Sequence, residues 1–173
     1  MKNPDYLALR IKVQEKTQEI EQRNQADILC KKGCSGCCRS GLSVSPIEFD
    51  FISSFLTESP EALKEALDAE RDLRKSPESC GFLTLSGSCS IYEVRPIICM
   101  SHGIPIQARI DEQIQKSVCP LNFKEGLDHI ESSNFINLDL INSILSLINA
   151  RDYEKSAERK SLTPSQFLHR ELK

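Results

Sequence analysis

Half of the eight cysteines in this sequence lie in one short segment, CKKGCSGCC. Two of them, Cys34 and Cys37, form a C-x2-C pair, a spacing at which a tight turn directs two thiolates toward one metal ion. Gly36 lies between them and permits the bend, because it has no Cβ. The segment therefore predicts metal ligation by its four cysteines: Cys30, Cys34, Cys37 and Cys38.

The other four cysteines are dispersed along the chain, as Cys80, Cys89, Cys99 and Cys119. Eight sulfurs could fill two four-ligand sites. Neighbouring side chains diverge on an extended backbone, so we expect Cys37 and Cys38 to serve two different centres, or one centre and the core. This predicts interleaved sites, in which the segment supplies ligands to each centre and the dispersed cysteines supply the rest. The metal would then cross-link parts of the fold that are distant in sequence.

Positive charge accompanies the cysteine segment. Lys31, Lys32 and Arg39 lie beside the sulfurs, and no acidic residue appears from Cys30 to Pro46. Nearby cations lower thiol pKa values. We therefore expect this segment to favour the thiolate form.

Two further residues are candidates for a role beside the cysteines. His102 stands three residues after Cys99 and could substitute for a cysteine ligand, or it could be an exposed histidine at a turn. Arg95 could pair with thiolate charge, or it could be a structural link that fixes the turn before Pro96.

Composition limits the class of protein. The N-terminus lacks an apolar signal core, and eight cysteines without an export signal point to a reducing cytoplasm, where such a pattern binds metal more often than it forms disulfides. The most apolar window, residues 135–150, is interrupted by polar residues and is too short for a bilayer, so no membrane partner is expected. The net charge of -3 comes without a basic block, so no nucleic-acid partner is expected.

The length of 173 residues favours one domain over 1–173. Within it we predict an N-terminal helix over 1–29, a cysteine-cluster metal-binding core over 30–120 and a C-terminal helical extension over 121–173. The fold class is mainly α with a small β-hairpin, and a cysteine-rich irregular core is organised around one or two metal centres. Helices are expected over 6–29, 46–56, 60–75 and 138–149, and a last short one from 164.

Local signals give these elements detail. Ser45 can cap the helix that Pro46 begins, and Glu48 completes a capping box. Two short apolar runs between Cys80 and Cys99 flank a Ser-Gly-Ser sequence and predict the hairpin. A further strand is expected in IPIQARI, over 104–110. The helix over 138–149 should face the core with Leu138, Ile141, Leu145 and Ile148.

The cysteine pattern, and above all the phrase CSIYEVRPIIC from Cys89 to Cys99, resembles the YkgJ-like or CxxCxxCC cysteine-cluster family. The resemblance extends from about Cys30 to Pro120, and it departs from the family's pattern in its first gap, which has three residues here. It implies a zinc- or iron-chelating domain with eight cysteines. A longer branch of the family looks like flagellin lysine methylases, but this chain has no evident second domain for that activity.

Three functions follow from these patterns. The first is a cysteine-cluster protein that holds zinc or iron, either as single ions or as an iron-sulfur cluster. The alternative is an iron-sulfur enzyme or redox protein, related to the lysine methylase-like members. The third is a thiol redox sensor that uses the adjacent cysteines. No catalytic motif is present, which leaves enzymatic activity an open question.

Overall fold

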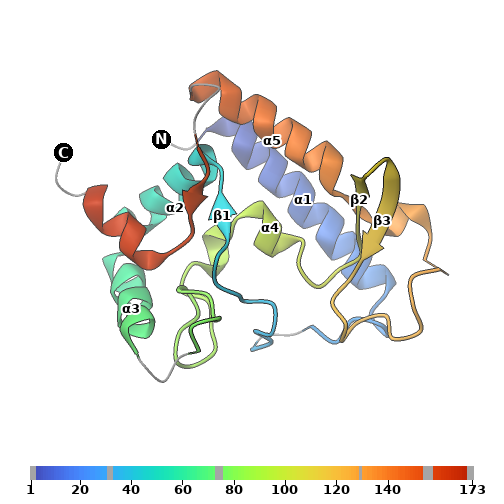
Figure 1. Cartoon of the computed structure of the whole chain (residues 1–173), viewed down its shortest axis with the longest axis horizontal. Coiled ribbons are helices and arrows are strands. Elements are labelled where there is room, and N and C mark those ends of the chain that lie inside the picture. The colour runs from blue at the N-terminus through green and yellow to red at the C-terminus, as the bar shows by residue number, and fades with distance from the viewer. Residues whose placement is uncertain (1–2, 31–32, 73–75, 129, 154–157, 171–173) are drawn as a thin grey trace. The chain divides into compact units, whose positions relative to one another are not determined.

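The computed structural model describes residues 3–30, 33–72, 76–128, 130–153 and 158–170 (Figure 1). These residues form two compact units, each assembled from segments that are distant in sequence. Unit 1 takes residues 33–96 and 152–170, and unit 2 takes residues 3–30 and 97–151, without the undescribed positions. The described chain is mainly helical with small sheets, as predicted. The single domain stays a prediction.

Unit 2 begins with the long helix α1 (Pro4–Arg23). The Asn3 side chain caps it by accepting a hydrogen bond from the Tyr6 amide at 2.9 Å. The predicted end at residue 29 is wrong, because the helix ends at Arg23. The next residue, Asn24, donates a hydrogen bond from its side-chain Nδ2 to the Ile20 carbonyl at 2.7 Å and caps the helix. The apolar side chains that α1 buries recur at helical spacing: Tyr6, Leu9, Val13 and Ile20.

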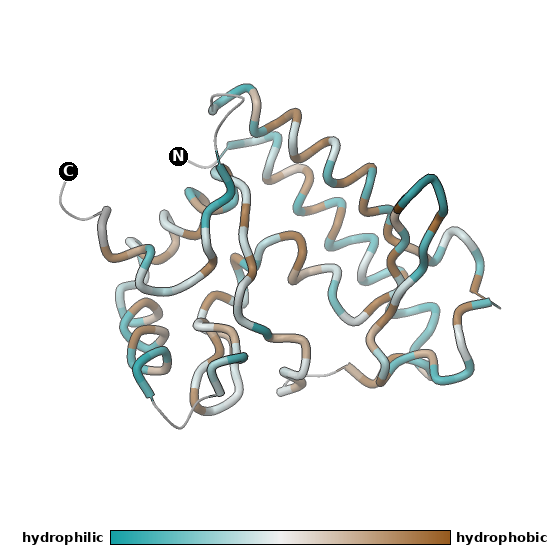
Figure 2. The backbone as a smooth tube through the Cα atoms, viewed as in Figure 1, coloured by the Kyte–Doolittle hydropathy of each residue, from teal (hydrophilic) through white to brown (hydrophobic). Residues whose placement is uncertain are grey.

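Two further helices belong to unit 2. The short α4 (Ile97–Met100) contacts α1, and α5 (Leu138–Asp152) lies in this unit up to Arg151. The core-facing pattern predicted for α5 is confirmed, since Leu145 and Ile148 are buried and Leu138 and Ile141 are half-buried. Figure 2 shows how hydrophobic and hydrophilic residues alternate along α1 and α5. A short 3-10 helix, η2 (Ser132–Asn134), precedes α5.

A three-stranded sheet completes unit 2, in the order β3-β2-β4. Strands β2 (Ile106–Ile110) and β3 (Gln113–Ser117) form an antiparallel hairpin, and β4 (Ile136–Asn137) pairs with β2 in parallel. The strand predicted in IPIQARI is therefore confirmed. The turn residues Asp111 and Glu112 have φ angles of 49° and 64°, as a two-residue type I′ turn requires.

Unit 1 contains the helices α2 (Pro46–Glu58) and α3 (Pro60–Arg71). The predicted capping box is confirmed, because the Glu48 carboxylate accepts hydrogen bonds from the Ser45 amide at 3.0 Å and its hydroxyl at 2.9 Å. The predicted end of the next helix at residue 75 lies outside the described residues. The remaining elements of unit 1 are β1 (Ser43–Val44), β5 (Lys160–Ser161) and the 3-10 helices η1 (Tyr92–Val94) and η3 (Pro164–Arg170).

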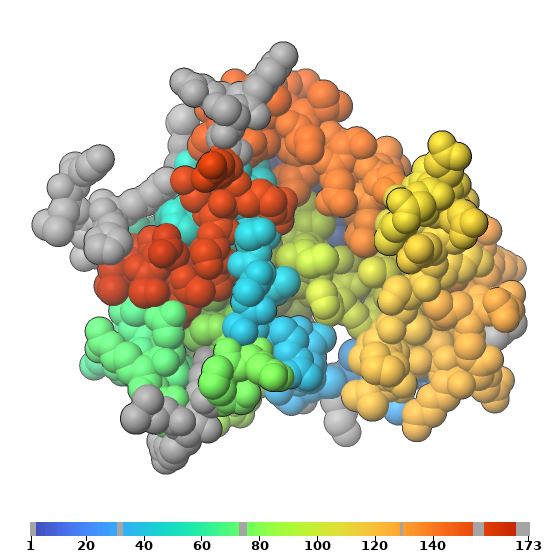
Figure 3. Space-filling model, viewed as in Figure 1, coloured from blue at the N-terminus to red at the C-terminus, as the bar shows by residue number. Residues whose placement is uncertain are grey.

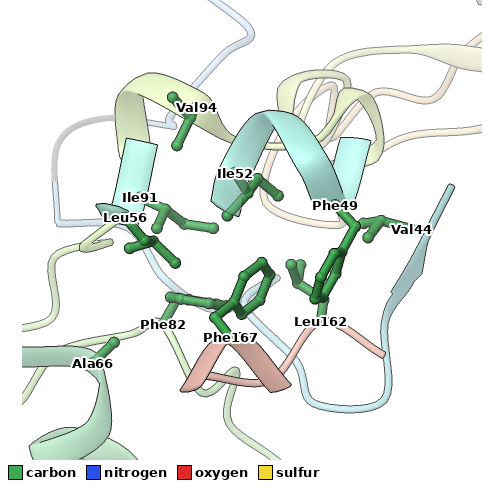
Figure 4. Packing of buried hydrophobic residues seen from close by; sticks show 10 residues of the cluster. All are labelled: Val44, Phe49, Ile52, Leu56, Ala66, Phe82, Ile91, Val94, Leu162 and Phe167. Atoms are coloured by element: carbon green, nitrogen blue, oxygen red, sulfur yellow. The ribbon is translucent and has the colours of Figure 1, made fainter. Parts of the chain in front are cut away.

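A compact apolar cluster forms the core of unit 1 (Figure 4). Phe167, on the last 3-10 helix, stacks on Phe49 at 4.2 Å between ring centroids and meets Phe82 edge-on at 5.6 Å. Cys80 and Cys89 pack against this cluster while remaining partly accessible. The two cysteines are therefore held at the edge of a hydrophobic core. None of the described helices is long and apolar enough to cross a bilayer.

Candidate metal centre

Backbone pairing between two distant segments of unit 1 brings the first sulfurs together. The Ser40 amide donates to the Glu78 carbonyl at 2.7 Å, and the Cys80 amide donates to the Cys38 carbonyl at 3.0 Å. These bonds surround an antiparallel bridge between Arg39 and Ser79. Figure 3 shows the two segments, in blue and light green, side by side on the visible face. Cys38 and Cys80 are therefore positioned by main-chain bonds.

A tight turn returns the chain from Cys80 to Cys89. The Gly87 amide donates to the Thr84 carbonyl at 3.0 Å, and Gly87 adopts a φ of 80°, which favours glycine. The predicted turn is confirmed, but the strands expected on either side are not formed among the described residues. A single bridge joins Leu83 to Cys89. The arms are too short for a ladder, and among the described residues it is β2 and β3 that form a hairpin.

Four sulfurs of unit 1 interact with one another. The pKa of the Cys38 thiol is raised from 9.0 to about 12, chiefly by burial and also by the nearby thiols of Cys37, Cys80 and Cys89. We call Cys37, Cys38, Cys80 and Cys89 the unit 1 thiol group. All four are half-buried free thiols. Without a cation, ionising several of them together would therefore be unfavourable.

Cys89 has a more favourable setting for negative charge. Burial raises the pKa of its thiol and the neighbouring Cys80 adds to this, whereas a hydrogen bond from the Ile91 amide and the charge of Arg95 lower it. The Arg95 guanidinium lies over the Tyr92 ring, 3.7 Å from its centroid. The predicted proximity of Arg95 to thiolate charge is thus present. That it assists a metal ligand stays a prediction.

The adjacent cysteines do not diverge as predicted. The Cys38 amide donates to the Ser35 carbonyl at 2.9 Å and the Arg39 amide to the Cys37 carbonyl at 3.0 Å, so the backbone turns here and is not extended. The two thiols are hydrogen-bonded to each other. The premise of an extended backbone was therefore wrong, whereas the division of the pair between two centres, or between one centre and the core, stays a prediction. Cys34, by contrast, is exposed.

Of the three positive charges beside the segment, the structure describes Arg39, and the expectation that it favours the thiolate form stays a prediction. Arg39 forms an ion pair with Glu78 at 3.0 Å, and both side chains are largely exposed. The other two charges, Lys31 and Lys32, lie outside the described residues. Arg39 therefore supports the pairing of the two segments.

Unit 2 holds three of the remaining sulfurs, and Cys30 has the best-defined surroundings. Its Sγ accepts a hydrogen bond from Asn122 Nδ2 at 3.3 Å. Asn122 is 2% exposed and also binds the backbone of Leu29 and Gly103. Sequence reasoning missed Asn122. The available signal was a turn-forming residue three positions after Cys119, and the Asn122 amide does donate to the Cys119 carbonyl at 2.9 Å.

Cys99, Cys119 and His102 are also placed in unit 2. Cys99 lies on α4 and Cys119 follows β3, and both are half-buried. His102 is exposed, and its Nδ1 lies 2.8 Å from the Ile98 carbonyl. A carbonyl can only accept, so this bond requires the hydrogen on Nδ1 and leaves the lone pair of Nε2 available.

The donor atoms fit a zinc or iron site by their chemistry. Thiolates are the soft ligands that both metals accept, and a divalent cation would offset the repulsion among them. Within the described ranges, no three Cys, His, Asp or Glu side chains are already gathered as ligands of one ion. The ligand set of eight cysteines therefore stays a prediction, as does the substitute role of His102.

Comparison with known families identifies the cysteine-bearing region. The family model described as "CxxCxxCC: Putative zinc- or iron-chelating domain" matches residues 29–120. Comparisons with curated proteins and with solved structures gave no match. The matched region is more than half of the 173 residues and includes all eight cysteines. The chain therefore belongs to the CxxCxxCC family, whose domain is described as zinc- or iron-chelating.

Proposed function

We propose that this chain binds zinc or iron through its cysteines and that the metal fastens segments that are far apart in sequence. The unit 1 thiol group carries the proposal. Its four sulfurs, from the segments around Cys38 and Cys80, interact with one another, and two of them, Cys80 and Cys89, pack at the edge of a hydrophobic core. Four thiolates are a complete ligand set for structural zinc and for common iron-sulfur clusters.

The residues around the thiol group would control how metal binds. The raised pKa of Cys38 keeps its thiol protonated at neutral pH, so ligation by this sulfur must release a proton, and the affinity depends on pH. The Ile91 amide and the Arg95 charge favour the ionised form of Cys89 and so support ligation. When bound, the metal supplies a cross-link between the two segments.

Unit 2 offers a second set of donors. Cys30, Cys99 and Cys119 provide three thiols, and His102 Nε2 provides a nitrogen whose ring is oriented by the bond from Nδ1 to the Ile98 carbonyl. Three cysteines and one histidine form a ligand set that structural zinc sites use. The segment would thus supply ligands to each of two centres, and the division falls between Cys30 and Cys37.

Eight cysteines in a metal-binding pattern suit a reducing compartment, so we place the protein in the cytoplasm in this proposal. We expect no nucleic-acid partner, given the net charge of -3.

Anaerobic purification followed by metal analysis and visible absorption tests the proposal. A colourless protein with zinc in fixed proportion supports a structural zinc protein. A brown protein with iron and acid-labile sulfide supports an iron-sulfur centre and makes the redox or enzymatic alternative the one to pursue. Protein that takes up neither metal under reducing conditions would overturn the proposed function.

A further inference from the structure

Asn122 is a buried polar side chain that directs its hydrogen bonds at the backbone and sulfur around Cys30. Its Oδ1 accepts from the Leu29 amide at 2.8 Å, and its Nδ2 donates both to the Gly103 carbonyl and to Cys30 Sγ. An amide has one oxygen acceptor and two N–H donors, so each kind of group is used here. Burying an amide is costly unless it is bonded in this way.

Gly103 lies against the Cys30 sulfur, as Asn122 does. Its φ is 96°, a left-handed conformation that favours glycine. A Cβ built on it would lie 3.0 Å from Cys30 Sγ, closer than ordinary packing permits. The sulfur therefore rests directly against the backbone, and no larger residue fits without moving it.

We propose that Asn122 positions Cys30 as a metal ligand and stabilises its thiolate, and that Gly103 provides the space for the sulfur. The inference rests on the proposed function and deepens it for unit 2. A neutral amide can donate N–H to a thiolate, and such donors stabilise the charge and orient the ligand. An aspartate of the same shape could only accept and would repel the sulfur.

The substitution Asn122→Asp tests this role. It keeps the oxygen that accepts from Leu29, but it removes both N–H donors and adds negative charge beside Cys30. In protein loaded with Co²⁺, we expect the affinity of the unit 2 centre to fall by about 10- to 100-fold. Any Co²⁺ that remains should show its sulfur-to-metal charge-transfer band at longer wavelength, because a thiolate without a donor is oxidised more easily.

Asn137→Asp is the matched control. Asn137 is exposed in the same unit, and its side-chain oxygen accepts from the Leu140 amide at 3.0 Å, which aspartate can still do. We expect wild-type Co²⁺ affinity and spectrum. If Asn122→Asp only lowered the melting temperature and left Co²⁺ affinity and the charge-transfer band unchanged, the residue would be structural and the inference wrong.

A pair of glycine variants gives an independent test should Asn122→Asp fail to fold. Gly103→Ala and Gly126→Ala both place alanine at a left-handed position, with φ of 96° and 94°, but nothing lies within 4 Å of a Cβ at Gly126. Both should lose similar stability from backbone strain. Only Gly103→Ala should weaken Co²⁺ binding, by about tenfold or more.

The outcomes separate this inference from the function on which it rests. Equal Co²⁺ affinity in the two glycine variants would overturn the role of the pocket around Cys30 and leave metal binding by the wild type intact. Wild-type protein that takes up no metal at all would overturn both.

Discussion

The two units handle sulfur in different ways. In unit 1, four thiols lie near one another, and burial together with their mutual repulsion holds the pKa of Cys38 high. In unit 2, the Cys30 sulfur rests against Gly103 and receives an N–H from the buried Asn122. A thiolate needs positive charge or hydrogen-bond donors to be stable away from water. If unit 1 binds metal as proposed, Cys38 depends on the cation for support, and within unit 1 the Ile91 amide and Arg95 support Cys89 alone. In unit 2, the chain itself supplies an N–H donor to Cys30.

The largest expected effect comes from removing one sulfur of the unit 1 thiol group. Cys38→Ser should lower the bound metal by about one ion per chain, because a closed zinc site needs all four of its ligands. Unit 2 should retain its metal, since its donors are separate. Metal analysis after anaerobic reconstitution measures the change.

Cys34→Ser is the control for that substitution, because Cys34 is exposed and lies outside the interacting group. It should lose less metal than Cys38→Ser. Complete loss of all metal from Cys38→Ser alone would mean that the two units share one centre. The contrast between a unit 1 site and a unit 2 site would then be wrong.

The next effect tests whether the apolar core supports the unit 1 sulfurs. Phe167→Ala removes a ring that stacks on Phe49 and meets Phe82, two residues after Cys80. We expect a loss of about 3–5 kcal/mol in unfolding free energy, as for other buried aromatic residues. Urea denaturation of the metal-loaded protein measures it, and metal release should begin at lower urea than in the wild type.

Leu168→Ala controls for this substitution, because the neighbouring Leu168 is 42% exposed. Its unfolding free energy should change by less than about 0.5 kcal/mol. Similar losses in both variants would show that the core and the thiol group are not linked through Phe167.

The elements that local chemistry determines were predictable. The start of α2 follows from Ser45 and Glu48, which lie three residues apart and bond each other, and the buried face of α5 follows from helical spacing. The type I′ turn of the β2–β3 hairpin was not predictable, since Asp111 and Glu112 replace the Asn-Gly or Asp-Gly that usually signals it.

The arrangement of the sulfurs depended on contacts between distant residues. Spacing identified the cysteines as candidate ligands, but it could not reveal that Cys38 pairs with Cys80 through the backbone or that the chain turns at Cys37. Asn122 was missed for the same reason: its partners, Leu29, Cys30 and Gly103, are far away in sequence. Local patterns predict which residues carry chemistry, and tertiary contacts decide how they are grouped.

A further effect concerns the pH dependence of metal binding in unit 1. The fold raises the pKa of Cys38 from 9.0 to about 12, so the protonated thiol is favoured in the metal-free fold and protons compete with the metal. Metal affinity should therefore rise with pH and continue to rise above about pH 9, where an ordinary thiol would already be ionised. Competition titrations with a zinc chelator across this range measure it. Affinity that levels off near pH 8 would contradict the prediction.

The smallest expected effect compares two arginines of unit 1. Arg95 is half-buried over the Tyr92 ring and lowers the pKa of Cys89, whereas Arg39 is exposed and paired with Glu78. Arg95→Gln should reduce the metal affinity of the unit 1 thiol group by up to about tenfold. The substitution removes a half-buried positive charge, which water screens less than an exposed one, from beside the Cys89 thiolate. Arg39→Gln should change it little, since an exposed ion pair contributes at most about 1 kcal/mol. Equal zinc affinities in the two variants would assign Arg95 to the turn before Pro96 alone, and the positive charge that unit 1 requires would then have to come from the metal itself.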